Sequence, residues 1–213
     1  MSFDLRQHSY LSPILNQGSC NSCWAYTTAQ CFSDRLKLYP DYLDPKHFLR
    51  KPICNFQDYG YDSFHNLDVK DFCSMDCSGG FLQHCHLYLL LEGLPSISNP
   101  RKKYKAKNIH QVTTEQMEPL EKRKAIMQEL HNGPVSAGFH LLPDFNNGSG
   151  FINKIYSSHG YSDDGHAVAI IGWGKGYWIC RNSMGRKFGE DGYFKMKMGV
   201  CGIEDDVWAI EPF

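Results

Sequence analysis

The fold is decided by the stretch Gln17-Gly-Ser-Cys-Asn-Ser-Cys-Trp-Ala-Tyr26, and the rest of the chain is interpreted outward from it. After Cys23, apolar residues recur at helical spacing as far as Leu38, where Tyr39-Pro40 ends the pattern. This spacing predicts a helix over 23–38 that begins at Cys23. Unpaired N–H groups and the positive end of the helix dipole favour a thiolate there. The pattern alone is equally compatible with a cysteine buried in the core.

Two further helices and several strands are predicted along the chain. Helical patterns cover about 81–91, ended by Gly93-Leu94-Pro95, and a segment that starts near Pro119 and runs through 120–131. Residues 40–76 lack periodicity and are expected to be irregular. Five short aromatic or β-branched runs are typical of antiparallel strands: Val135–His140, Ala167–Trp173, Tyr177–Arg181, Gly192–Met198 and Val207–Ile210. A helical first half and a β-rich second half predict an α+β protein with two lobes.

Composition narrows the class of protein. The formal net charge is −1, so neither nucleic acid nor an anionic membrane is expected as a partner. The basic run 101–107 is interpreted as a solvated loop, and no apolar stretch approaches the roughly 18–20 residues of a membrane span. Nine cysteines, an odd number, favour disulfides plus one reactive thiol in an oxidising compartment. Residues 1–15 contain no signal-peptide pattern.

The stretch around Cys23, with a histidine and an asparagine far downstream, resembles the papain-like cysteine peptidases. The resemblance spans nearly the whole chain, although residues 41–76 and 94–115 match weakly. The matching segments are Gln17–Trp24, Cys77–Gly80, Asn132–Val135, Gly165–Val168, Gly172–Gly174, Tyr177–Trp178, Asn182–Ser183 and Gly189–Gly192. Cys201–Glu204 and Ser33–Arg35 are most similar to the cathepsin B branch of that family.

The resemblance implies a single papain-like domain over residues 1–213. A mainly helical lobe would cover about 12–100 and a β-barrel-like lobe about 105–206, with terminal segments that cross between the lobes. The active-site cleft would lie between them. Phe3-Asp-Leu-Arg6 is similar to the start of a mature family member. We therefore expect a lysosomal, vacuolar or secreted mature fragment to which Met1 was added, although the sequence alone leaves a cytosolic form open.

Four residues receive catalytic roles from the resemblance. Cys23 would be the nucleophile, and His166 would hold its thiolate as an ion pair and then protonate the leaving amine. Asn182 would orient the imidazole, and the Gln17 side chain would stabilise the oxyanion together with the Cys23 backbone N–H. Taken singly, each of these last three residues is more often a surface, turn or loop residue.

Seven residues are expected to contact an extended peptide substrate. Gly79 and Gly80 would expose bare backbone to the peptide. Asp206 would lie at the base of the pocket for P2, the second residue on the amino side of the scissile bond, and would pair with Arg or Lys. Asp206 is also compatible with a surface carboxylate. The other expected contacts are Gly138, Gly165, Ala167 and Phe188.

The chain departs from the family pattern at three positions. Asn21 replaces a glycine, and asparagine tolerates positive φ. Met184 replaces the tryptophan that shields the His–Asn hydrogen bond, and Phe188 replaces a second tryptophan on the leaving-group side. We therefore expect poorer shielding of His166 and Asn182.

The resemblance also implies disulfides. Cys20–Cys77 matches a bridge found throughout the family, and Cys54–Cys73 follows the cathepsin B pattern. Pairing of Cys31 with Cys85 and of Cys180 with Cys201 stays open, because all four are equally compatible with buried thiols. Glycosylation at Asn147 is left open too.

The leading interpretation is a monomeric cysteine endopeptidase without cofactor or metal. Its partners would be protein or peptide substrates and propeptide or cystatin-like inhibitors. The segment between Gly80 and Tyr104 is too short for the histidine-bearing loop by which cathepsin B removes C-terminal dipeptides. One alternative is a catalytically silent homologue that binds peptides or inhibitors. Another is a metal-binding module, whose ligands would be Cys73, Cys77, His84 and His86.

Overall fold

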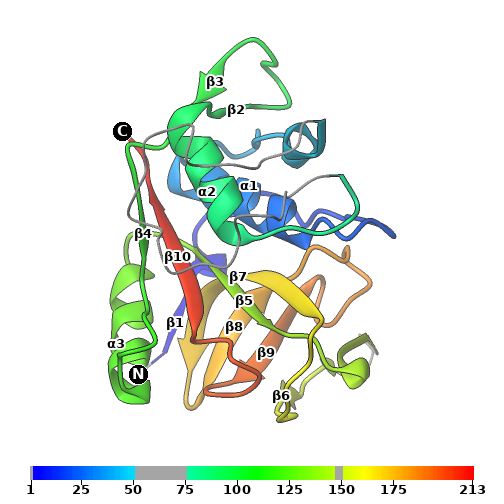
Figure 1. The fold of residues 1–213 in the computed structure, drawn as a ribbon, viewed down its shortest axis with the longest axis vertical. Helices are drawn as coiled ribbons and strands as arrows, with labels where there is room; N and C mark the ends of the chain where they lie inside the picture. Colours follow the sequence, from blue (N-terminus) through cyan, green and yellow to red (C-terminus); the bar gives the residue numbers. More distant parts are fainter. Residues whose placement is uncertain (1, 51–75, 147–150) are drawn as a thin grey trace.

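The computed structural model describes residues 2–50, 76–146 and 151–213, and it has two lobes (Figure 1). Helices α1 (Cys23–Arg35) and α2 (Leu82–Leu91) lie in one lobe with the short 3-10 helix Pro45–Arg50. An eight-stranded sheet forms the other lobe, and α3 (Pro119–Glu129) lies beside its β4 edge (Figure 1). The predicted α+β class is confirmed.

Helix α1 is the central helix, because every residue after Cys23 is buried. It ends at Arg35, three residues earlier than predicted. Lys37 adopts the left-handed conformation with φ 54°, and its N–H donates to Asp34 O. The Leu38 N–H donates to Ser33 O over 3.1 Å, which completes a Schellman motif. Local hydrogen bonding therefore ends the helix before Tyr39-Pro40 is reached.

The other two helices begin close to their sequence signals, and α3 ends at Glu129, two residues before the predicted end at 131. Helix α2 stops at Leu91, and Gly93 follows it with φ 72°, a conformation that glycine adopts without strain. Helix α3 starts at Pro119. Glu118 and Glu121 form a reciprocal capping box with each other's backbone N–H groups, which satisfies two of the orphan donors.

The sheet runs in the order β4-β10-β5-β7-β8-β9-β6, and β1 pairs with β7. All pairs are antiparallel except β6 with β9. Its strands are β1 (Phe3–Asp4), β4 (Asn108–Gln111), β5 (Val135–His140), β6 (Ile155–Tyr156), β7 (Gly165–Gly174), β8 (Tyr177–Arg181), β9 (Tyr193–Lys197) and β10 (Asp206–Glu211). A separate pair joins β2 (Leu94–Pro95) to β3 (Lys103–Tyr104). Short 3-10 helices cover Leu5–Gln7 and Pro143–Asn146.

Both ends of the chain are tied to the sheet. Phe3 pairs with Trp173 through β1 and β7, and the two rings stack at 4.8 Å. Near the other end, Ile210 of β10 pairs with Ile109 of β4, and its carbonyl accepts a hydrogen bond from the Arg35 guanidinium of α1. The last strand therefore reaches the helical lobe, as Figure 1 shows for β10 and α1.

The cysteines divide into one disulfide and several thiols. Cys20 and Cys77 form the predicted bridge, with their Cα atoms 4.7 Å apart. The two pairings that the sequence left open do not form. Cys31, Cys85, Cys180 and Cys201 are free and buried, and the Cys201 thiol instead donates to Ser158 O. The predicted Cys54–Cys73 bridge and Asn147 lie outside the described residues. No described helix has the length and apolarity needed to span a membrane.

Candidate active site

Cys23 and His166 meet where the central helix touches the sheet. Cys23 is the first residue of α1, and His166 is the second residue of β7. One helical turn after Cys23, the buried Thr27 hydroxyl donates to Ala167 O over 3.0 Å. This hydrogen bond links α1 to the residue that follows His166. Packing of α1 on the sheet therefore brings Cys23 and His166 together, although they are far apart in the sequence.

The His166 ring is held by Asn182, which directly follows β8. The Asn182 Oδ1 accepts hydrogen bonds from the Ser183 backbone N–H and from His166 Nε2, each over 2.8 Å. Because the Ser183 N–H is a donor, it identifies the oxygen side of the amide. His166 Nε2 therefore carries a proton, and the Nδ1 atom is left for the hydrogen bond with Cys23.

The pKa values of the pair move in opposite directions. Burial by itself raises the pKa of the Cys23 thiol, but the charge and hydrogen bond of His166 outweigh it, helped by the backbone N–H groups of Ala167 and Trp24. The pKa of Cys23 is therefore lowered. Burial lowers the pKa of His166, and Cys23 and Asn182 reverse this, so the pKa of His166 is raised. Together these shifts favour a thiolate–imidazolium pair.

The helix N-terminus contributes to this electrostatic setting. Ser22, the residue before α1, makes no side-chain hydrogen bond to the first turn. Within the first turn, the Trp24 N–H donates to the Cys23 side chain, and the N–H groups of Ala25 and Tyr26 donate to Ser22 O. The positive end of the helix dipole adds to the effect of the Trp24 N–H. The prediction that Cys23 stands at a helix N-terminus is confirmed.

The prediction that His166 and Asn182 are poorly shielded from solvent is wrong. Asn182 is 0% exposed and His166 is 5% exposed. The Phe139 and Phe145 rings lie with their centroids 5.6 and 5.7 Å from the imidazole. Met184, the residue in place of the expected tryptophan, is only partly buried against the core. Phenylalanines from other segments therefore exclude water where the sequence suggested a gap.

Gln17 is held between the loop before Cys23 and the residue after Asn182. Its side-chain Nε2 donates to Cys20 O over 2.7 Å, and its Oε1 accepts from the Ser183 hydroxyl. These two contacts orient the amide with one Nε2 hydrogen still available. The Gln17 backbone N–H also donates to Ser183 O over 2.8 Å. The loop before α1 is thereby fastened to the residue after Asn182.

Three of the expected substrate contacts form one row across neighbouring strands. Asp206 of β10 is paired with Gly138 of β5, which in turn is paired with Ala167 of β7. Side chains directly opposite one another in antiparallel pairs share one face of the sheet. A Cβ atom at Gly138 would lie 2.9 Å from Asp206 Oδ2, so the glycine leaves room for the carboxylate.

The Asp206 carboxylate is tied to both lobes. Its Oδ1 accepts hydrogen bonds from Trp208 Nε1 over 2.7 Å and, from α2, from Gln83 Nε2 over 3.3 Å. Burial raises the pKa of Asp206, and the hydrogen bond from Trp208 opposes this only in part. A surface carboxylate free in solvent is therefore not what the structure shows.

The remaining expected contacts differ in exposure. Gly79 has φ 110°, and a Cβ atom there would meet none of the described atoms within 4 Å. Gly79 and Gly80 are each partly exposed. Gly165 is exposed next to His166. Phe188 is only 6% exposed, and its ring packs against Phe145 at 5.3 Å. Its contribution is to the aromatic core, and it presents no free ring face to a substrate.

Sequence reasoning missed the residues that complete this surface. Leu82 and Trp208, which were not predicted, form a small apolar cluster with the predicted Ala167, and Cys23 packs against this cluster. Thr27 and Gln83 were missed as well. The only sequence signal for Thr27 was its helical spacing of four from Cys23, and Gln83 has no signal, because its partner Asp206 is distant in sequence.

The geometry does not favour the metal-binding alternative. Cys77 is taken up by the disulfide with Cys20, and Cys73 lies outside the described residues. His84 and His86 are buried on α2, and burial lowers the pKa of each to about 4. Among the described residues, no group of three or more His, Cys, Asp or Glu side chains is arranged to hold a metal ion.

Comparisons with known proteins agree with this geometry. The chain is 28% identical to cathepsin B-like CP2 of Giardia intestinalis, over 98% of the chain and 73% of that protein. It is also 28% identical to cathepsin S of Bos taurus, over 95% of the chain and 62% of that protein. Its fold matches the bromelain protease from Ananas comosus in complex with the E64 inhibitor, with a TM-score of 0.74, 19% identity and coverage of 100% of this chain and 99% of that one.

A second solved structure, proCathepsin B from Trypanosoma congolense, matches with a TM-score of 0.71 and 23% identity, over 100% of this chain and 77% of that one. The family model for papain family cysteine proteases matches residues 1–44 and 62–210, which is most of the chain. The protein therefore belongs to the papain family of cysteine proteases.

Proposed function

We propose that this protein is a cysteine endopeptidase in which Cys23 attacks the peptide carbonyl. The observation that carries the proposal is the placement of His166, hydrogen-bonded both to Cys23 and to Asn182 Oδ1. A catalytic base needs an orienting partner on its far side as well as a nucleophile on its near side. The lowered pKa of Cys23 and the raised pKa of His166 support an ion pair that is formed before substrate binds.

The proposed reaction has two halves. The Cys23 thiolate adds to the carbonyl carbon, and the oxyanion is stabilised by the Cys23 backbone N–H and by the free Nε2 hydrogen of Gln17. His166 Nδ1–H then protonates the leaving amine, and a thioester remains. In the second half, His166 takes a proton from water, which attacks the thioester and releases the acid and the thiolate. Asn182 holds the ring throughout.

An extended peptide would bind over surfaces that lack obstructing side chains. Gly79 and Gly80 are partly exposed and carry no side chain, which supports main-chain hydrogen bonding to the peptide, as in strand addition. The row formed by Ala167, Gly138 and Asp206 supports a P2 pocket with apolar walls and a carboxylate at its base. Trp208 and Leu82 add apolar surface beside Cys23. We therefore assign the P2 preference to Arg and Lys.

Cleavage at internal bonds is favoured by the segment between Gly80 and Tyr104. Helix α2 and the β2–β3 pair occupy this segment. Its two histidines, His84 and His86, are 2% and 0% exposed. Neither ring is available to bind the carboxyl terminus of a substrate, so the chain should act as an endopeptidase rather than remove dipeptides.

Relatives suggest the partners. The bromelain protease structure contains the E64 inhibitor, and the trypanosomal relative is a procathepsin. We propose that an inhibitor such as E64 and a propeptide bind over Cys23 of this protein. The Cys20–Cys77 disulfide supports a secreted, lysosomal or vacuolar location.

The nucleophile is tested by two matched substitutions on the same helix. Cys23→Ala should abolish hydrolysis of an internal peptide bond. Cys31→Ala should retain it, because Cys31 is buried and burial raises the pKa of its thiol to about 11. Activity in Cys23→Ala equal to wild type would overturn the proposal. Products made up only of C-terminal dipeptides would overturn the endopeptidase part alone.

The P2 pocket is tested by two neighbouring carboxylates. Asp206→Ala should lower the ratio of kcat/KM for substrates with Arg and with Phe at P2 by about tenfold or more, since a charge-assisted hydrogen bond contributes about 1.5–3 kcal/mol. Asp205→Ala is the control, because Asp205 is exposed and pairs with Lys122. An Arg/Phe ratio that is the same in Asp206→Ala and Asp205→Ala would contradict the assignment.

A further inference from the structure

A buried ion pair includes Arg181, the residue immediately before the proposed catalytic residue Asn182. Arg181 Nη2 is 2.7 Å from Asp34 Oδ2, and both side chains are 0% exposed. The Ser12 backbone N–H donates to Asp34 Oδ1 over 2.5 Å, and Arg181 Nη1 donates to the Ser12 hydroxyl over 3.2 Å. Ser12, Asp34 and Arg181, here called the Arg181 cluster, belong to three segments that are remote in the sequence.

Each of the three segments carries a proposed catalytic residue. Asp34 belongs to α1, which begins with Cys23. Arg181 is the last residue of β8, immediately before Asn182. Ser12 belongs to the segment without regular secondary structure that leads to Gln17. The Arg181 cluster is thus a junction of the nucleophile, the orienting amide and the oxyanion donor.

The contact between the second and third segments continues from the junction to the active site. Arg181 bonds Ser12, the Gly185 N–H donates to Leu15 O over 3.0 Å, and the Gln17 N–H donates to Ser183 O over 2.8 Å. A β-bridge between Asn16 and Met184 lies within this run. A shift of Arg181 relative to Ser12 would therefore be transmitted to Asn182 and Gln17 together.

We propose that Asp34 and Arg181 are positioning residues for the peptidase reaction, which set the place of Asn182, and through it the His166 ring, relative to Cys23. The inference rests on the proposed function. Neither residue touches the substrate or the reacting atoms. A buried ion pair is weak evidence for stability, since desolvation offsets much of the attraction between its charges. The Arg181 cluster does restrict geometry, because the guanidinium contacts Asp34 at Nη2 and Ser12 at Nη1, and the Ser12 N–H in turn donates to Asp34.

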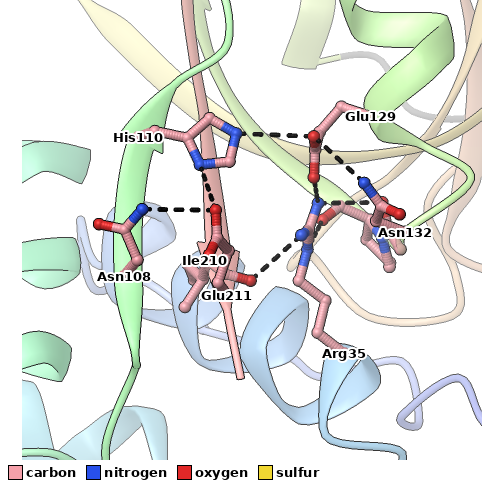
Figure 2. A network of polar contacts seen from close by, with 9 residues as sticks. Arg35, Asn108, His110, Glu129, Asn132, Ile210 and Glu211 are labelled. Atoms are coloured by element: carbon pink, nitrogen blue, oxygen red, sulfur yellow. Dashed lines mark hydrogen bonds and ion pairs between the residues drawn. The ribbon is translucent and has the colours of Figure 1, made fainter. Parts of the chain in front are cut away.

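A second ion pair formed by α1 provides a matched control for an experiment on Asp34 and Arg181 (Figure 2). Arg35, the residue after Asp34 in α1, pairs with Glu129 of α3 over 2.9 Å, and the side-chain exposures are 2% and 14%. This pair also joins α1 to a segment remote in sequence. Its other contacts are to the carbonyls of Pro134, Ile210 and Gly133, none of which adjoins a proposed catalytic residue.

The experiment compares Asp34→Asn with Glu129→Gln, each of which turns the carboxylate partner of a buried arginine into its isosteric amide. The readouts are kcat and KM per active site counted with iodoacetamide, and the pH dependence of Cys23 alkylation by the same reagent. Asp34→Asn should lower kcat by about 10- to 100-fold, the loss expected for displacement of about 1 Å, and leave KM within about twofold. The Asp34→Asn substitution should also narrow the pH range over which iodoacetamide alkylates Cys23. Arg181→Lys, which keeps the charge, should retain more kcat than Arg181→Met.

Glu129→Gln should lower the thermal midpoint and leave both kcat and the alkylation profile unchanged. The inference is overturned if Asp34→Asn behaves as Glu129→Gln does. If Asp34→Asn does not fold, the neutral double variant Asp34→Leu/Arg181→Met takes its place, and wild-type kcat in that variant is equally contrary. Failure of the wild-type protein to hydrolyse peptides would instead overturn the proposed function, so the two failures are distinguishable.

Discussion

Helix α1 contributes Asp34 to an ion pair with Arg181 and the next residue, Arg35, to an ion pair with Glu129. The two pairs differ in their electrostatics. Asp34 is fully buried, and burial raises the pKa of its carboxyl group more than Arg181 lowers it. Burial raises the pKa of Glu129 as well, but there His110 and Arg35 outweigh it, and the pKa of Glu129 falls to about 2. Figure 2 shows the reason, since Glu129 lies between two cationic side chains.

The difference separates a contact that restricts geometry from one that stabilises the fold. A carboxyl group whose pKa is raised on folding favours the unfolded state once it ionises, so Asp34 costs stability near neutral pH. A carboxyl group whose pKa is lowered from 4.5 to about 2 stabilises the folded state above about pH 4.5, and that contribution is lost as the pH falls toward 2. The stabilising pair lies away from the active site, and the costly pair adjoins Asn182.

The largest effect is expected when one member of the buried pair is removed alone. Arg181→Met leaves the Asp34 carboxylate buried without its counter-charge, which costs about 3–5 kcal/mol of unfolding free energy. Urea denaturation measures this loss. Addition of Asp34→Leu should restore most of it, because a neutral pair of similar volume packs without desolvation cost. A loss below about 1 kcal/mol in the single variant would mean that water reaches the carboxylate.

A smaller loss is expected from Glu129→Gln. The substitution removes the charge from contacts with Arg35 at 2.9 Å and His110 at 3.5 Å and keeps the shape of the side chain. Hydrogen bonds to charged groups contribute about 1.5–3 kcal/mol, and partial exposure of His110 places the expected loss near the lower end. Thermal denaturation near neutral pH checks it. The comparison fails if this variant loses as much stability as Arg181→Met.

The hydrogen bond between α1 and β7 is expected to contribute less to the free energy of unfolding than the Glu129 contacts do. Thr27→Val removes the donor to Ala167 O and keeps the side-chain volume, at a cost of about 1 kcal/mol. Because Ala167 follows His166, kcat should fall in the same variant. Thr28→Val is the matched control, since the Thr28 hydroxyl donates to Trp24 O within the helix and does not cross to the sheet. Equal kcat values in the two variants would show that Thr27 does not help to position His166.

The smallest effect concerns the pH dependence of stability. His110 lies 3.3 Å from Glu211, and its hydrogen bond to Glu129, the largest cause, raises its pKa above 6.5 although burial opposes this. A raised histidine pKa contributes stability that is complete below about pH 6.5 and is lost as the pH rises through the folded value. The other charged group near the ring, Arg35, opposes protonation and limits the shift.

This effect is measured from thermal midpoints between about pH 5.5 and pH 8.5. The wild-type midpoint should decline across that range, and the decline should be shallower in His110→Gln. The side chain is 36% exposed, so the difference should stay below about 1 kcal/mol. Identical slopes for the two proteins would show that His110 does not titrate as part of the network.

Much of the fold was predictable because it follows from local signals. Apolar periodicity and aromatic runs gave β5 and β8 residue for residue and gave the start of α1 at Cys23. The short strands β1 and β4 were not predicted, because each acquires its structure from a partner strand remote in sequence. The end of α1 was missed because a lysine at positive φ, here Lys37, carries no sequence signal.

The same distinction applies to the site. The four proposed catalytic residues were recognisable from motifs around Cys23, His166 and Asn182. The contacts that position them were not, since Asp34 and Arg181 meet only in the folded chain and charged residues usually indicate a solvated surface. The aromatic shielding of His166 was missed for a similar reason, because Phe145 comes from a segment with no motif of its own.

The central claim is that Cys23 is a thiolate held by His166, and the rate of its alkylation by iodoacetamide from about pH 4 to about pH 9 tests that claim most directly. Among the cysteines of the described residues, mass spectrometry should find Cys23 alone modified, since the other free thiols there are buried. The alkylation rate should rise at a pH clearly below that of an ordinary thiol, because the Cys23 pKa is lowered and the His166 pKa is raised. A rate that rises only near pH 8.5, as for an ordinary thiol, would contradict the account.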